Sequence, residues 1–165
     1  VAHMMTIGWG QGNSCSFGNK SGSVIKNISS GIVCVGEYDS GQDSIYAKSA
    51  YVRPTSMTFV YKASPYGDDE YLITDGLETV IGRAEIKSNN TQSDYITQNL
   101  DVVYNEQFVQ LPISHVRLIF KAGTKEDRDH LEDKFSKEGS GSFYSNYYLK
   151  GSQFWLDSFV LNYNK

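Results

Sequence analysis

The 165-residue chain carries 15 Lys and Arg against 19 Asp and Glu, and its basic residues are scattered, so no footprint for a nucleic-acid backbone is present. No apolar run approaches the roughly 20 residues that span a bilayer, which excludes a transmembrane segment in this stretch. The length fits one domain, and 15 Gly, 12 Tyr and only 3 Pro favour a β-rich protein with glycine-driven turns.

The opening Val1-Ala2-His3-Met4 resembles a cloning scar, because His-Met is left by a common restriction site at a start codon. We therefore expect residues 1–4 to add nothing to the fold, residues 5–165 to form a single domain, and any native leader to lie upstream. Residues 5–23 are rich in Gly, Ser and Asn and predict an irregular entry arm. Within the arm, Trp9 either covers one end of the domain or contacts a ligand.

Two cysteines, Cys15 and Cys34, permit one disulfide, provided that their Cα atoms lie within about 7 Å. The alternative is a pair of separate thiols, which is common for a cysteine in a strand such as 32–35. The sequence leaves both alternatives open.

From Val24 onward, period-two alternation predicts successive strands, most clearly over 57–61 and 116–120. Ile96 and Leu100 keep one parity through another strand, and Asp75-Gly76 predicts a tight hairpin between 70–74 and 78–81. Eight or nine such strands without βαβ alternation predict an all-β, antiparallel jelly-roll β-sandwich.

The stretch from Thr124 to Glu138 is charged at nearly every position. Leu131 and Phe135 are four residues apart, so this insertion between strands is expected to form one short helix with a single apolar edge and a solvated face. Its acidic residues lack the spacing and central glycine of an EF-hand loop.

The closing strand from Gly151 to Tyr163 places Asp157 in step with apolar Phe159 and Leu161, and with Trp155, which we expect in the core. A carboxylate at the rim of a core must accept backbone N–H groups, meet a cation, or lie at a bulge that turns it outward. Asp157 is therefore a candidate ligand of a structural calcium ion, paired with carbonyl groups of the entry arm, or a carboxylate held by the backbone.

Three segments carry a family resemblance: 53–62, the turn Ser64-Pro65-Tyr66-Gly67, and the closing strand with Gly151-Ser152 and Asp157. Together they resemble the carbohydrate-metabolism-domain and related domain-of-unknown-function families of bacterial surface proteins, over roughly residues 23–163. The resemblance implies a jelly roll like that of carbohydrate-binding modules, exported to the cell surface and often joined to other domains. Family members commonly carry a second acidic residue where this chain has Ser158, which weakens a shared metal site.

Catalytic patterns are weak in this sequence. His115 begins a strand and is expected at the surface, and no Gly-x-Ser-x-Gly motif accompanies it. A glycosidase needs two facing carboxylates, but the run Asp68-Asp69-Glu70 is expected to be solvated, and Glu85, Asp94 and Asp101 have outward parity. We therefore expect no enzyme, and a glycoside hydrolase is only a minor alternative.

Sugar binding asks for exposed aromatic rings beside amide and carboxylate groups. Several aromatic residues fall outside the inward pattern: Trp9, Tyr46, Tyr51, Tyr66, Tyr95, Tyr144, Tyr147 and Tyr148. Of these, we select Tyr66, Tyr144, Tyr147, Tyr148 and Trp9 as candidate ligand-binding residues.

These patterns lead us to expect a non-catalytic carbohydrate-binding module, extracellular or on the bacterial cell surface, whose partner is a polysaccharide or other glycan. The alternative is an adhesin or assembly domain that binds a protein. A sugar site should present a solvent-facing ring beside polar groups, whereas an adhesion surface should be flatter and more continuously apolar.

Overall fold

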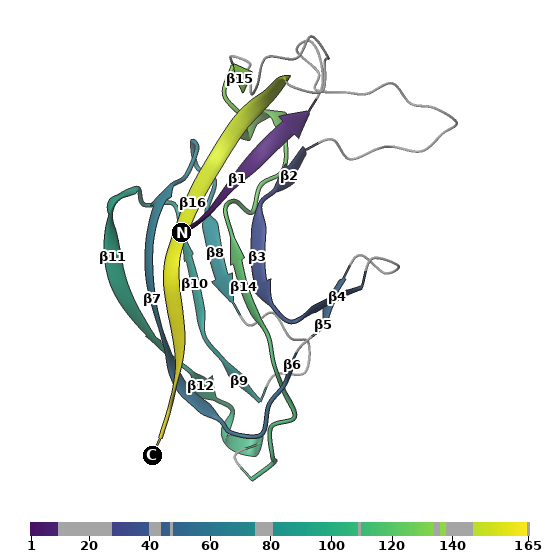
Figure 1. Ribbon diagram of the computed structural model, residues 1–165, viewed down its shortest axis with the longest axis vertical. Helices are drawn as coiled ribbons and strands as arrows, with labels where there is room; N and C mark the ends of the chain where they lie inside the picture. The colour runs from purple at the N-terminus through teal and green to yellow at the C-terminus, as the bar shows by residue number, and fades with distance from the viewer. Residues whose placement is uncertain are drawn as a thin grey trace.

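Two antiparallel sheets stack face to face in the computed structural model, which describes residues 1–9, 28–39, 44–46, 48–74, 81–108, 110–133, 136–137 and 147–164 (Figure 1). This arrangement confirms the predicted all-β antiparallel sandwich. No helix in the described ranges is long and apolar enough to cross a membrane.

The larger sheet has six strands. Its order is β11 (Gln92–Asp101), β7 (Pro54–Ser64), β16 (Tyr147–Tyr163), β1 (Ala2–Trp9) and β2 (Ile28–Ser30), with β15 (Ser136–Lys137) paired to β16. The smaller sheet has the order β10 (Glu85–Ser88), β8 (Tyr71–Thr74), β14 (Leu118–Lys121) and β3 (Ile32–Val35).

Three two-stranded ladders extend these sheets. They pair β4 (Glu37–Asp39) with β5 (Ser44–Tyr46), β6 (Lys48–Ser49) with β13 (His115–Val116), and β9 (Gly82–Arg83) with β12 (Val103–Tyr104). A 3₁₀ turn, η1, spans Glu106–Phe108.

Period-two alternation builds the core, as the sequence predicts. Along β7, inward Phe59 and Tyr61 alternate with outward residues, and Tyr61 stacks on Phe154 of β16 at a ring-centroid distance of 5.3 Å. Phe120 of β14 approaches from the smaller sheet and is fully buried. Each of these side chains contributes about 1.5–3 kcal/mol by leaving water.

The amino-terminal strand corrects the expectation for the first residues. β1 lies between β16 and β2, and Met4 is only 5% exposed and belongs to the core. The expectation that residues 1–4 stay outside the fold is therefore wrong, as is the irregular arm over Met5 to Trp9. The sequence did not indicate this strand because its inward positions are occupied by polar Thr6 and by small Gly8. Apolar side chains at such positions are the usual sign of a strand.

Two local predictions also fail. Thr74 at the end of β8 pairs with Glu85 of β10, so the strands are joined by a ten-residue connection rather than a hairpin at Asp75-Gly76, which lies outside the described residues. The expected helix is reduced to the 3₁₀ turn η2 (Arg128–His130). Leu131, directly after the turn, is fully buried and packs with Ile28 and Leu149, whereas Phe135 lies outside the described residues.

Candidate functional site

The structure separates the candidate tyrosines that the sequence grouped together. Tyr66 lies half-exposed in the β7–β8 turn, and its backbone N–H donates to Ser152 Oγ at 3.0 Å. Tyr148, at the start of β16, is only 6% exposed, so its prediction as an exposed ligand-facing ring is wrong. Tyr144 and the side chains of Tyr147 and Trp9 lie outside the described residues, so their roles stay predictions.

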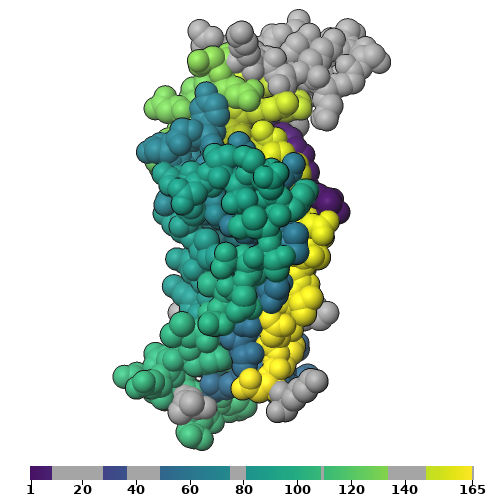
Figure 2. All heavy atoms as spheres, turned by 90° about the vertical axis from the view of Figure 1, so that its left-hand side faces the viewer, coloured from purple at the N-terminus to yellow at the C-terminus, as the bar shows by residue number. Residues whose placement is uncertain are grey.

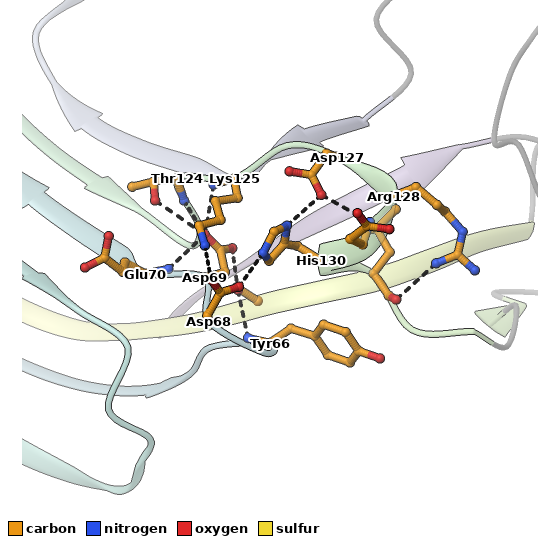
Figure 3. Close-up of polar contacts among 12 residues, drawn as sticks. Tyr66, Asp68, Asp69, Glu70, Thr124, Lys125, Asp127, Arg128 and His130 are labelled. Carbon is orange, nitrogen blue, oxygen red and sulfur yellow. Dashed lines mark hydrogen bonds and ion pairs between the residues drawn. The ribbon is translucent and has the colours of Figure 1, made fainter.

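The Asp68-Asp69-Glu70 run is not uniformly solvated. Asp69 is 0% exposed, and its Oδ1 accepts the backbone N–H groups of Glu70, Thr124 and Lys125 at 2.8–2.9 Å, while its Oδ2 accepts the Ser152 hydroxyl at 2.6 Å (Figure 3). An ionised carboxylate is tolerated in the interior when it is bonded in this way. Asp69 therefore joins the β7–β8 turn to the segment after β14 and to β16.

Asp68, next to this buried group, belongs to an exposed charge network. His130 lies between two carboxylates: Nε2 is 2.6 Å from Asp68 Oδ1, and Nδ1 is 2.6 Å from Asp127 Oδ1 (Figure 3). The Lys125 ammonium contacts the other Asp68 oxygen at 2.5 Å. Asp68 and Asp127 thus hold the 3₁₀ turn η2 against the β7–β8 turn.

These contacts fix the protonation states of the network. Hydrogen bonds from Lys125 and then His130 lower the pKa of Asp68 to about 2, and the hydrogen bond with His130 lowers the pKa of Asp127. Burial acts to lower the pKa of His130, but its bonds to the two carboxylates outweigh that effect and the pKa is raised. These directions favour the charged forms, two carboxylates around a protonated imidazole.

Asp157 follows the third of the alternatives that the sequence left open. The register between β16 and β7 shifts between Leu156 and Ser158, so Asp157 lies at a bulge and is exposed. β1 and β16 do pair, as the calcium hypothesis required, but the described residues contain no group of three or more His, Cys, Asp or Glu that could hold a metal ion. Calcium binding by Asp157 stays a prediction, tested by thermal melting with and without calcium.

The same bulge explains why Trp155 does not lie in the core as predicted. Inward Phe154 and Leu156 are followed, after the bulge, by inward Phe159, so parity counted back from Phe159 assigns Trp155 to the wrong face. The Trp155 ring instead lies on the outer face of the larger sheet and stacks on His3 of β1 at 4.5 Å, with the planes 9° apart.

A row of side chains crosses four strands of this outer face. The Lys62 ammonium lies 4.6 Å from the Trp155 ring centroid and 5.2 Å from that of Tyr95 on β11. His3 Nε2 donates a hydrogen bond to Gln153 Oε1 at 3.1 Å. We call Lys62, Trp155 and His3 the buttress, because together they support one side of the Tyr95 ring.

Tyr95 is 43% exposed and occupies an irregular part of the edge strand. The register of β11 with β7 shifts between Gln92 and Ile96, which places additional β11 residues opposite Lys62. Bulges of this kind re-aim side chains and are frequent at functional sites. Since β11 has no strand beyond it in the described part of the chain, no described strand covers the Tyr95 ring on the side away from Lys62.

Amide and hydroxyl groups continue along the same face. Asn162 Nδ2 donates to Thr58 Oγ1 at 2.8 Å, the Thr58 hydroxyl donates to Asn99 Oδ1 at 3.0 Å, and Asn99 Nδ2 donates to Asp101 Oδ1 at 3.0 Å. We call these four residues the polar ladder. Figure 2 shows the side of the molecule on which β11, β7 and β16 are exposed together.

An apolar groove lies at another part of the sandwich. It encloses about 500 Å³ and is lined by residues that include Tyr51, Val52, Val116 and Tyr163. Tyr51 is 89% exposed, and Val52 and Tyr163 are also exposed. This groove has exposed rings but little polar lining, in contrast to the face around Tyr95.

The sequence contained the signal for Tyr95 but gave it no priority. Ile96 was assigned inward, so its neighbour Tyr95 had to point outward, and Tyr95 was among the eight aromatic residues outside the inward pattern. What could not be read was the bulge, or the support from Lys62 and Trp155, which are distant in sequence. Cys34 is a half-buried free thiol in β3, whereas Cys15 lies outside the described residues, so their pairing stays a prediction.

Comparison with solved structures finds a likeness of fold to two bacterial proteins. The chain is similar to a putative glycoside hydrolase from Bacteroides vulgatus, with a TM-score of 0.51 and 14% identity over 84% of this chain and 66% of that chain. It is also similar to a putative glycoside hydrolase from Bacteroides thetaiotaomicron, with a TM-score of 0.54 and 15% identity over 85% of this chain and 49% of that chain. This chain thus spans only part of the length of both structures, and at these identities the likeness shows the fold.

No protein-family model and no curated protein matches the sequence.

Proposed function

We propose that this domain binds a glycan, without cleaving it, on the outer face of its larger sheet. The observation that carries the proposal is the solvent-facing Tyr95 ring, supported on one side by Lys62 and followed along β11 by amide and hydroxyl groups. A pyranose presents an apolar C–H face that stacks on an aromatic ring and hydroxyl groups that bond to amides. Tyr95 and Asn99 offer these two kinds of contact on one face.

Preorganisation strengthens the proposal. The cation between Tyr95 and Trp155, and the stacking of Trp155 on His3, hold the rings in place before a ligand arrives. A ring already held costs less entropy on binding than a mobile one. The two solved structures of similar fold are both named putative glycoside hydrolases, which supports a carbohydrate as the class of ligand.

Two acids next to the β7–β8 turn, Asp68 and Asp127, do not fit the role of a general acid. A glycosidase keeps one carboxyl group protonated by raising its pKa, so that the acid can protonate the leaving oxygen. Asp68 and Asp127 have pKa values shifted in the opposite direction, and both are bonded to His130. We place the domain at the cell surface or outside the cell, in accord with a polysaccharide partner and with the family resemblance.

A polysaccharide array with the purified domain tests the proposal, using immobilised cellulose, xylan, mannan and β-1,3-glucan beside a wider set of bacterial and host glycans. We expect retention on at least one glycan, reduced about twofold to tenfold by Tyr95→Ala, because stacking on one ring contributes about 0.5–1.5 kcal/mol beyond the area it buries. Tyr51→Ala is the control, since it removes an even more exposed tyrosine from the apolar groove. Retention that survives Tyr95→Ala unchanged would refute this site.

The second candidate is an adhesin or assembly domain. It is favoured by one observation, the groove near Tyr51, Val52 and Tyr163, where exposed apolar side chains gather. Absence of binding to every glycan, together with capture of a defined surface protein that Tyr51→Ala abolishes, would favour that function over glycan binding.

A further inference from the structure

Four outward side chains follow one another along the edge strand β11. Tyr95, Thr97, Asn99 and Asp101 are all exposed, and inward Ile96 and Leu100 alternate with them. Tyr95 and Asn99 are four residues apart, which corresponds to about 13 Å along a strand that rises about 3.3 Å per residue. The strand therefore presents a ring at one point and an amide well beyond the reach of a single sugar stacked on that ring.

The amide of Asn99 has hydrogen-bonding capacity left over. One N–H donates to Asp101, and Oδ1 accepts from Thr58. A primary amide has two N–H donors and two lone pairs on its oxygen, so one donor and one lone pair have no partner among the described residues. Asp101 Oδ2 and the Thr97 hydroxyl likewise take part in no hydrogen bond within the described ranges. These unused groups and Tyr95 all lie on the outer face of the larger sheet.

A ligand running across the strands would not meet equivalent contacts. In that direction the ring of Trp155 has His3 on one side and the Lys62 ammonium over its face, so its stacking surfaces are occupied. The Tyr95 ring alone in this row keeps a side that no described strand covers. From Tyr95, the exposed polar side chains of Thr97, Asn99 and Asp101 continue along β11.

We propose, on the basis of the glycan-binding function above, that the ligand is a linear chain of at least about three sugars that lies along β11. One sugar stacks on Tyr95, and a sugar two places along the chain bonds to Asn99, with Thr97 between them. A pyranose with its linkage spans roughly 5 Å, given bonds of about 1.5 Å, so three of them cover the interval of about 13 Å. Hydrogen bonds with Thr58 and Asp101 hold the Asn99 amide in place. Because only a chain of about three sugars reaches this amide, Asn99 makes affinity depend on the length of the ligand.

Titration calorimetry with cello-, xylo-, manno- and laminari-oligosaccharides, from monosaccharide to hexasaccharide, tests the proposal. In the series that binds, affinity should rise at least tenfold from the monosaccharide to the trisaccharide or tetrasaccharide and then level off. Asn99→Ala should lower affinity for the tetrasaccharide about fivefold to tenfold, the equivalent of one lost hydrogen bond, and leave the mono- and disaccharide unaffected. Tyr95→Ala should weaken binding at every length.

Asn90→Ala is the matched control, because Asn90 is exposed in the turn before β11 and lies off this line of contacts. Thermal melting confirms that each variant is folded. Equal affinity for monosaccharide and tetrasaccharide, or an Asn99→Ala loss that is the same at all lengths, would overturn the track along β11 while leaving glycan binding at Tyr95 intact. If no series and no polysaccharide binds, the proposed function itself fails and the track fails with it.

Discussion

Two polar regions of the sandwich, Asp69 in the interior and the β11 face outside, use the same kinds of groups in opposite ways. The Asp69 carboxylate is fully buried and accepts hydrogen bonds from three backbone N–H groups and from the hydroxyls of Ser152 and Thr124. Asn99 and Asp101 make fewer bonds and keep donors or acceptors facing water. A buried polar group whose donors and acceptors are all satisfied within the protein stabilises the fold. An exposed polar group with unsatisfied donors or acceptors, next to a supported aromatic ring, is suited to binding a ligand.

The largest expected effect on stability comes from removing the buried Asp69 carboxylate. Asp69→Ala leaves the partly buried N–H groups of Thr124 and Lys125 without their acceptor, and we expect a loss of about 2–3 kcal/mol in the free energy of unfolding, measured by urea denaturation. Asp69→Asn keeps an oxygen for these donors and should lose less. Asp68→Ala, at the exposed neighbouring position, should have a much smaller effect. Equal losses for Asp68→Ala and Asp69→Ala would contradict the contrast.

The second test adds a methyl group at Gly123, next to the Asp69 carboxylate. A Cβ at Gly123 would lie 2.2 Å from Asp69 Oδ2 and 2.7 Å from Thr6 Oγ1, so Gly123→Ala should destabilise the domain by about 1–3 kcal/mol in the same denaturation experiment. Gly67→Ala serves as a comparison, since a Cβ there meets open space and only its positive φ of 63° opposes the change. We expect it to cost about 1 kcal/mol. A stable Gly123→Ala variant would mean that the Asp69 region can relax.

A smaller effect is expected on the outer face. Lys62→Met removes the cation between Tyr95 and Trp155 but keeps a long apolar side chain, so stability should fall by only about 0.5–1 kcal/mol. Glycan affinity should fall threefold to tenfold, because the Tyr95 ring loses its support. Lys87→Met is the control: it removes an ion pair with Glu70 on the smaller sheet and should leave affinity unchanged. Equal glycan affinities for Lys62→Met and Lys87→Met would show that the buttress has no role in glycan binding.

The smallest effect concerns pH. The raised pKa of His130 means that its contribution is complete below its unfolded pKa of about 6.5 and is lost as pH rises through the higher folded value. Asp68 has a lowered pKa of about 2, so its contribution is complete above about pH 4 and is lost as pH falls toward 2. Thermal melting should therefore show a shallow decline on both sides of pH 4–6.5. His130→Asn should flatten the alkaline side, and an unchanged profile would remove His130 from the network.

The sequence predicted the sandwich because the pattern of inward Phe59 and Tyr61 is local and regular. It failed at Trp155 because one bulge reverses the parity of a strand, although a bulge that turns Asp157 outward was one of the alternatives left open. It failed at Asp69 because the N–H groups that make burial of the carboxylate possible belong to Thr124 and Lys125, more than fifty residues away. Tyr95 could be recognised as outward-facing, but its supporting cation depends on cross-strand register.

The most direct test of glycan binding around Tyr95 is a map of backbone amide chemical shifts as a bound tetrasaccharide is titrated into labelled protein. The shifts should concentrate on residues 93–101 of β11 and on neighbouring β7 near Lys62, and should be absent around Asp69 and the Tyr51 groove. Shifts centred on Tyr51 and Tyr163, with β11 unchanged, would place the ligand elsewhere and contradict the assignment of this face.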